Sequence, residues 1–242
     1  MAAGDLPGAT GPSGPTGPAG SRPPPAAAHV PHPAPQAATR LKRAAPSTRR
    51  PDDGHMAEIV LIRHGETEWS AAGRHTSYTD LELTENGEFQ ARAAGERLKD
   101  RNFAAVISSP RRRALRTADL AGLTVTETTE DLAEWNYGKY EGITTLTIHE
   151  SDPGWWLWRD GAPEGESPDQ VAARLDRALA HARTFLPRGD VALIAHGHSL
   201  RAAGARWLGL PVEYGGRLRL GTATISTLSF EHGREAIATW NA

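Results

Sequence analysis

The chain has 242 residues, no cysteine, and a formal net charge of −2 from 27 basic and 29 acidic side chains. Without cysteine, disulfides, thiolate catalysis and cysteine-bound zinc are excluded, and the balanced charge gives no indication of nucleic acid or a membrane surface as a partner. No apolar run approaches the roughly 18 residues of a membrane span. The N-terminus lacks the apolar core of a signal peptide, so we expect a cytoplasmic protein.

Residues 1–55 differ in composition from the rest of the chain. They hold 12 of the 18 prolines and none of the tryptophan, tyrosine or phenylalanine. Such a segment cannot bury enough apolar surface to offset the entropy lost on ordering, so we expect a disordered tail. Its basic run, Arg40–Arg50, is expected to be solvated charge. Residues 56–242 then form one folded domain of 242 − 55 = 187 residues, an ordinary domain size.

Apolar runs alternate with amphipathic stretches along this domain. In chain order, we expect a strand at 58–62, a helix at 83–100 capped by Thr84, a strand at 104–109, a helix from Pro110 to near Gly122, and a strand at 124–129. A second series follows, with a helix at 167–186 capped by Ser167, a strand at 190–197, a helix at 199–209, and closing strands at 222–230 and 235–240. This alternation predicts a three-layer α/β/α sandwich with a mainly parallel central sheet.

Reactive side chains follow the ends of the predicted strands. Arg63 and His64 end the first, three arginines follow the second, and His196 ends the late apolar strand. Ligands of open α/β sheets bind at the carboxyl ends of the strands, so these groups are expected to converge. Arginine suits phosphate oxygens, a neutral imidazole is a competent nucleophile, and a helix start after His196 would offer free N–H groups to an anion. A phosphoryl group is the expected occupant.

Four motifs carry a family resemblance. The segments "LIRHGETEW", "SSPRRRALRTA", "LAEWNYGKYEG" and "VALIAHGHSLRA" resemble, in order, the motifs of the histidine phosphatase superfamily, in its phosphoglycerate-mutase-like branch. The whole run is most similar to the actinobacterial acid phosphatases of that branch. The resemblance implies the phosphoglycerate-mutase-like fold and hydrolysis of small phosphorylated metabolites, with no cofactor and no metal.

The resemblance also implies a role for each matching residue. His64 attacks phosphorus and becomes phosphohistidine, while Arg63 and Arg113 hold the phosphoryl oxygens. The spacing of the second motif selects Arg113, and we expect its neighbours Arg111 and Arg112 to be surface charge.

The later motifs supply the remaining roles. His196 stabilises charge on the transferring group, with the Gly197 amide beside it. Glu134 protonates the leaving oxygen and then helps to activate water. Ser70 occupies a position where the mutases usually carry asparagine, which leaves its substrate-binding role open. With a neutral nucleophile and a protonated acid, activity is expected on the acid side of neutral, about pH 5–6.5.

Other functions remain to be weighed. A serine α/β-hydrolase would use Ser199 in "GHSLR", but Arg201 stands where the nucleophile turn needs glycine. A non-catalytic phosphate-binding protein would be expected to have lost a nucleophile or an arginine, and none is missing. A phosphoglycerate mutase would carry substrate-gripping basic residues after the acid motif, where only Lys139 and Arg159 stand between Glu134 and Arg174. A phosphatase is therefore favoured.

For several side chains we expect a structural rather than a catalytic role. His196 and His198 have the look of a metal pair but lack a third ligand at a fixed spacing, and His198 could line the mouth of the pocket instead. The aromatic group with Trp155, Trp156 and Trp158 is expected to pack a lid segment rather than a substrate. No catalytic part is expected for the other histidines, His75, His149, His181 and His232. Whether two copies form a homodimer is left open.

Overall fold

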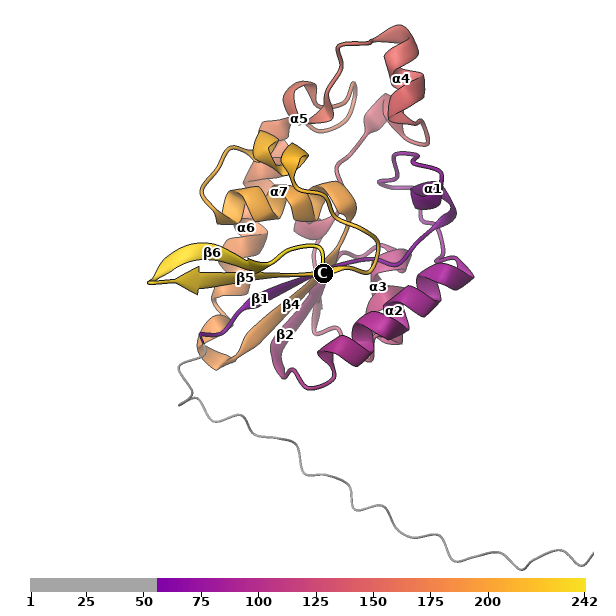
Figure 1. The fold of residues 1–242 in the computed structure, drawn as a ribbon. Helices are drawn as coiled ribbons and strands as arrows, with labels where there is room; N and C mark the ends of the chain where they lie inside the picture. Colours follow the sequence, from indigo (N-terminus) through magenta and orange to yellow (C-terminus); the bar gives the residue numbers. More distant parts are fainter. Residues whose placement is uncertain (1–55) are drawn as a thin grey trace, which may run out of the picture. The chain divides into compact units, whose positions relative to one another are not determined.

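The computed structural model describes residues 56–242, and the predicted tail at residues 1–55 lies outside the described residues. Six strands form one sheet in the order β3-β2-β4-β1-β5-β6 (Figure 1). Neighbours among β3, β2, β4 and β1 are parallel, and β5 and β6 continue the sheet antiparallel. The mainly parallel sheet is therefore confirmed. Its strands are β1 Ile59–Arg63, β2 Phe103–Ser108, β3 Glu127–Thr128, β4 Asp190–Ala195, β5 Ile225–Glu231 and β6 Arg234–Thr239.

Helices cover both faces of the sheet, as the three-layer prediction requires. Helices α2 (Glu85–Leu98) and α3 (Arg112–Leu120) lie on one face, and α6 (Pro168–Arg183) and α7 (Gly197–Trp207) lie on the other (Figure 1). None of the helices within residues 56–242 has both the length and the apolar character needed to span a bilayer. The shorter helical elements are α1 Glu68–Ala71, α4 Thr145–Ser151, α5 Leu157–Asp160 and the 3₁₀ turns η1 Glu130–Leu132, η2 Gly138–Tyr140, η3 Leu186–Arg188 and η4 Val212–Arg217.

Strand β1 shows why the sheet needs cover on both sides. Its side chains alternate between faces: Ile59 and Leu61 join the core cluster that contains residues of α6 and α7, whereas Val60 and Ile62 join the cluster that contains residues of α2 and α3. All four are fully buried. An unbroken apolar run is therefore what this strand requires.

Two of the predicted helix starts, those after Thr84 and Ser167, are confirmed by their capping hydrogen bonds. The Thr84 side chain accepts from the Gly87 amide at 3.0 Å. Ser167 and Gln170 form a reciprocal capping box at the start of α6, with Pro168 in the first turn. Each cap satisfies an amide that the helix itself cannot pair.

Several predicted boundaries are off by two or three residues: the strand expected at 222–230 begins at Ile225, the strand expected at 190–197 ends at Ala195, and the helix expected from Pro110 begins at Arg112. Two further differences have a local cause. The strand expected at 124–129 shortens to two residues, because the Thr126 hydroxyl replaces a backbone partner and accepts the Val106 amide at 3.0 Å. Helix α7 begins at Gly197 rather than Ser199, since His196 is already its N-cap. Helices α4 and α5 were not expected at all.

Strand register places the two histidine motifs, at His64 and His196, together. Strands β1 and β4 are parallel neighbours, with Arg63 opposite Ala195. The residues that follow, His64 and His196, therefore leave the sheet side by side, and the His64 amide donates to the Ala195 carbonyl at 2.9 Å.

Candidate active site

A cavity of about 210 Å³ opens at the carboxyl ends of β1 and β4. Five of the predicted site residues line it: Arg63, His64, Ser70, Glu134 and Gly197. The remaining lining residues are Gly73, Arg74, His75, Thr76, Tyr137, Thr145, His198, Arg201 and Leu220. Three arginines and one carboxylate make the wall basic, which suits an anion.

The orientation of the His64 ring is set by a hydrogen bond from one of its two nitrogens. Its Nδ1 lies 2.7 Å from the Gly65 carbonyl oxygen. A carbonyl only accepts, so Nδ1 carries the hydrogen and Nε2 keeps a lone pair. Burial, and then the charges of Arg113 and Arg63, lower the pKa of His64 well below its usual value. The imidazole is therefore neutral and nucleophilic at Nε2.

Glycine is needed after His64 because α2 approaches the backbone there. A Cβ on Gly65 would lie 2.3 Å from the Gly87 carbonyl oxygen, closer than atoms can approach. The Gly65 amide donates to the Thr117 hydroxyl at 2.9 Å, which ties the turn to α3. The turn that presents His64 is fixed by helices on one face of the sheet.

Arg63 lies against the start of α7. Its Nη1 donates to the Leu220 carbonyl at 2.6 Å, while its buried Nε has no hydrogen-bond partner among the described residues. A Cβ on Gly197 would approach the Arg63 Cζ to 3.3 Å, so glycine allows this close packing. A buried N–H without an acceptor, at the wall of a basic cavity, is suited to an anionic oxygen.

Arg113 and His196 do not line the cavity; both are fully buried. Arg113 Nε donates to His196 Nδ1 at 3.1 Å, and the His196 Nε2 lies 2.7 Å from the Ser109 hydroxyl. Because Arg113 can only donate, Nδ1 of His196 accepts and Nε2 carries the hydrogen. The His64 and His196 ring centroids are 5.2 Å apart.

The other Arg113 nitrogens hold a loop. They donate to the carbonyls of Thr76, Ser77 and Thr79 at 3.1–3.2 Å. Four of the five guanidinium N–H groups are thus bound, leaving one on Nη1 for a ligand. Burial and the Arg113 charge lower the pKa of His196 well below its usual value, so this ring is neutral as well.

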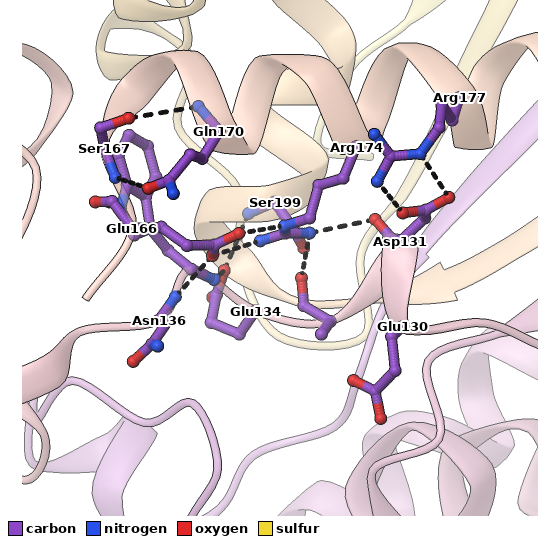
Figure 2. Close-up of polar contacts among 12 residues, drawn as sticks. Glu130, Asp131, Glu134, Asn136, Glu166, Ser167, Gln170, Arg174, Arg177 and Ser199 are labelled. Carbon is purple, nitrogen blue, oxygen red and sulfur yellow. Dashed lines mark hydrogen bonds and ion pairs between the residues drawn. The ribbon is translucent and has the colours of Figure 1, made fainter. Parts of the chain in front are cut away.

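Glu134 caps helix α7. Its Oε1 accepts the amides of Trp135 and Ser199, both at 2.8 Å, and Figure 2 shows Glu134 beside Ser199. Its Oε2 accepts the His198 amide at 3.0 Å. The expectation of free N–H groups at this helix start is therefore wrong for His198 and Ser199. The Gly197 amide makes no hydrogen bond within the described residues and remains for a ligand.

The cavity also contains residues that the sequence analysis left out. Arg201 donates from Nε and Nη2 to the carbonyls of Gly215 and Gly216 at 3.0 and 3.1 Å, and its Cζ lies 4.8 Å from the Trp158 ring centroid. Its position four residues after Gly197, on the same helix face, was the available signal. Arg74, at the exposed rim, carried no such signal.

Two histidines form part of the wall. His198 lines the cavity, as one interpretation held, with its Nδ1 2.6 Å from the Tyr137 hydroxyl. His75 also lines it, and burial lowers the pKa of His75 to about 4. Burial and then Arg201 lower the pKa of His198 well below its usual value. Both rings are neutral, so the positive charge of the wall comes from arginine.

Several alternatives lose support in this geometry. Ser199 is fully buried, and its hydroxyl accepts the His196 amide at 3.3 Å, so it is not an exposed nucleophile. Ser70 lines the cavity, but its hydroxyl hydrogen-bonds with the Thr67 backbone at the start of α1. Trp155 and Trp158 belong to the apolar core.

His196 and His198, considered above as a metal pair, hydrogen-bond to different residues. His196 contacts Arg113 and Ser109, and His198 contacts Tyr137. Within residues 56–242, no three or more histidine, aspartate or glutamate side chains come together as a metal site would require.

Comparison with known proteins agrees with this geometry. Residues 59–242 match the family model of the histidine phosphatase superfamily, branch 1, and the chain belongs to this family. An acid phosphatase of Mycobacterium tuberculosis is 50% identical over 182 residues, which cover 74% of this chain and 90% of the relative. A probable phosphoglycerate mutase of Photorhabdus laumondii is 34% identical over 199 residues, covering 76% and 90%.

A solved structure shows the same fold. The product of an open reading frame of Mycobacterium tuberculosis superimposes with a TM-score of 0.75 at 47% identity, covering 77% of this chain and 98% of that one. The predicted family and fold are confirmed.

Proposed function

We propose that this phosphatase hydrolyses small phosphate monoesters through a phosphohistidine on His64. The observation that carries the proposal is the bond from His64 Nδ1 to the Gly65 carbonyl. It leaves Nε2 unprotonated at the wall of a basic cavity. An unprotonated imidazole held between arginines is equipped to attack a phosphorus atom whose oxygens those arginines bind.

The first half of the reaction moves the phosphoryl group to the protein. His64 Nε2 forms a bond to phosphorus, the bond from phosphorus to the ester oxygen breaks, and the leaving oxygen takes a proton from Glu134. The Arg63 Nε and the Gly197 amide bind the oxygens on phosphorus at the cavity wall, and the remaining Arg113 N–H is proposed to join them, although Arg113 itself is buried behind that wall. His196 orients Arg113 by accepting the hydrogen bond from its Nε.

The second half returns His64 to its starting state. Water attacks phosphorus, gives a proton to the Glu134 carboxylate, and the phosphorus–nitrogen bond breaks to release phosphate. The carboxylate receives two amides on Oε1 and one on Oε2, so Oε2 is the oxygen with room for the proton. Its place at the cavity wall supports both transfers.

The mutase alternative finds little support in the segment after Glu134. Lys139 pairs with Glu164 at 2.7 Å, and Arg159 pairs with Asp160 at 2.7 Å. Neither cation lines the cavity. With no basic residue of this segment at the cavity to grip the substrate, we expect water to reach the phosphohistidine.

The substrate is proposed to be a small phosphorylated metabolite, because the cavity is small, at about 210 Å³. Arg201 and Arg74 add positive charge to the wall and favour esters with a further anionic group. The cytoplasmic location and the homodimer remain predictions.

Purified protein would be assayed for phosphate release from a panel of esters, and for interconversion of 2- and 3-phosphoglycerate. We expect release without interconversion, unaffected by EDTA. Interconversion much faster than release would make the protein a mutase. His64→Ala should show neither reaction.

A further inference from the structure

The segment that carries Glu134 has no regular secondary structure of its own. It runs between the 3₁₀ turns η1 and η2. Yet the Glu134 carboxylate meets both the first turn of α7 and the cavity. Its position therefore depends on contacts that other elements make with the neighbouring backbone.

Arg174 of α6 holds the backbone before Glu134. Its Nη1 donates to the carbonyls of Asp131 at 3.0 Å and Ala133 at 2.7 Å. Its Nε and Nη2 donate to the two carboxylate oxygens of Glu166 at 2.7 and 3.0 Å (Figure 2). Arg174 is buried, and four of its five N–H groups are bound in this way. A two-pronged contact of this kind fixes direction as well as distance.

Glu166 holds the backbone after Glu134. Its Oε2 accepts the Asn136 amide at 2.8 Å, its carbonyl accepts Trp135 Nε1 at 2.9 Å, and its own amide donates to the Asn136 carbonyl at 2.9 Å. The preceding residue must be glycine for this approach, because a Cβ on Gly165 would lie 2.1 Å from the Asn136 carbonyl oxygen. Glu134 is thus fixed on both sides by one ion pair.

We propose that Arg174 and Glu166 are positioning residues that set the place of the Glu134 carboxyl relative to the leaving oxygen. The inference rests on the proposed function, in which Glu134 transfers the proton. Neither residue lines the cavity, so both act through the backbone on either side of Glu134. Misplacing a reacting group by about 1 Å can cost about 10²-fold in rate.

A matched control lies three residues further along α6. Arg177 pairs with the Asp131 side chain, its Nη2 donating to Oδ1 at 2.6 Å (Figure 2). The Arg177 side chain is 63% exposed, and it makes no contact with the carbonyls that Arg174 holds. Removing it changes the charge of the same helix without releasing the backbone beside Glu134.

The test measures kcat/KM for a series of phosphate monoesters whose leaving groups range from 4-nitrophenol to simple alcohols. Arg174→Met should lower kcat/KM for alkyl phosphates roughly 10- to 100-fold and for 4-nitrophenyl phosphate by no more than about 3-fold, because kcat/KM covers only the transfer to His64, in which only poor leaving groups need the proton. Glu134→Gln should give the same pattern more strongly. Arg174→Lys should recover part of the loss, and Arg177→Met should match the wild type throughout.

A double-mutant cycle separates positioning from general stabilisation. In the Glu134→Gln background, Arg174→Met should change kcat/KM for alkyl phosphates by less than about twofold, because the two residues act as one unit. An equal loss for all leaving groups, or an undiminished loss in the Glu134→Gln background, would overturn the inference.

Two other results of these experiments are also informative. If Arg174→Met does not fold, Glu166→Gln takes its place in the cycle under the same criteria. If Glu134→Gln shows no dependence on the leaving group, the proposed proton transfer fails. The cycle then still decides whether Arg174 acts through Glu134.

Discussion

Replacement of Arg113 by methionine should impair both stability and catalysis, because its guanidinium joins the site to the loop behind it. The change leaves four acceptors without a donor: His196 Nδ1 and the carbonyls of Thr76, Ser77 and Thr79. Two of them, on His196 and Ser77, belong to buried residues. At about 1–3 kcal/mol for each unsatisfied buried group, the free energy of unfolding should fall by about 2–6 kcal/mol.

The neighbouring arginines provide the comparison. Arg112 pairs with Glu82 on the surface, as expected. The side chain of Arg111 is only 15% exposed, so the expectation of surface charge is wrong for it, and it pairs with the exposed carboxylate of Glu130. Urea unfolding of the three methionine variants should show a large loss of stability for Arg113 alone. Phosphate release under folding conditions should fall by roughly 10²–10³ for Arg113→Met, the scale of a deleted oxyanion donor. Small and equal effects at all three positions would show that the wrong arginine has been assigned to the site.

Three further predictions concern the buried histidines, Arg201 and the tail. The folded-state pKa of His75, about 4, lies below its unfolded value of about 6.5, so acidification protonates the unfolded chain first. His75 alone should therefore lower the free energy of unfolding by up to about 3 kcal/mol between pH 6.5 and pH 4, and His64, His196 and His198, whose pKa values are also lowered, should add to that fall. Urea titrations at several pH values check this, and a pH-independent result would contradict it. Arg201→Met should lower kcat/KM more for esters with a second anionic group than for matched neutral esters. Arg206→Met, on the same helix, should leave the ratio of these two kcat/KM values unchanged. If Arg201→Met also left that ratio unchanged, Arg201 would have no part in substrate selection. Removal of residues 1–55 should leave turnover and melting temperature unchanged, and a marked drop in either would give the tail a role.

Local patterns predicted those parts of the fold that local physics decides. The apolar run at 58–62 required two buried faces, and both exist around β1. Thr84 and Ser167 begin helices because each side chain reaches an amide three residues ahead. The placement of His64 beside His196 followed from two parallel strands that end at the same level.

The contacts that the sequence could not supply join residues far apart in the chain. Glu134 accepts amides 64 and 65 residues away, and Arg174 donates to a carbonyl 41 residues away. No periodicity encodes such pairs. Arg113 shows the same limit, because its spacing pointed to the site but gave no sign that most of its donors hold a loop.

The central claim is that His64 carries the phosphoryl group, and trapping that intermediate tests it most directly. The protein would be mixed with a ³²P-labelled monoester, quenched in alkali within the first turnover, digested and analysed for the labelled peptide. The predicted result is an acid-labile, base-stable label on His64 that forms and decays at rates compatible with turnover, and no label in His64→Ala. Undiminished phosphate release by the alanine variant, or a label on any other residue, would contradict the account.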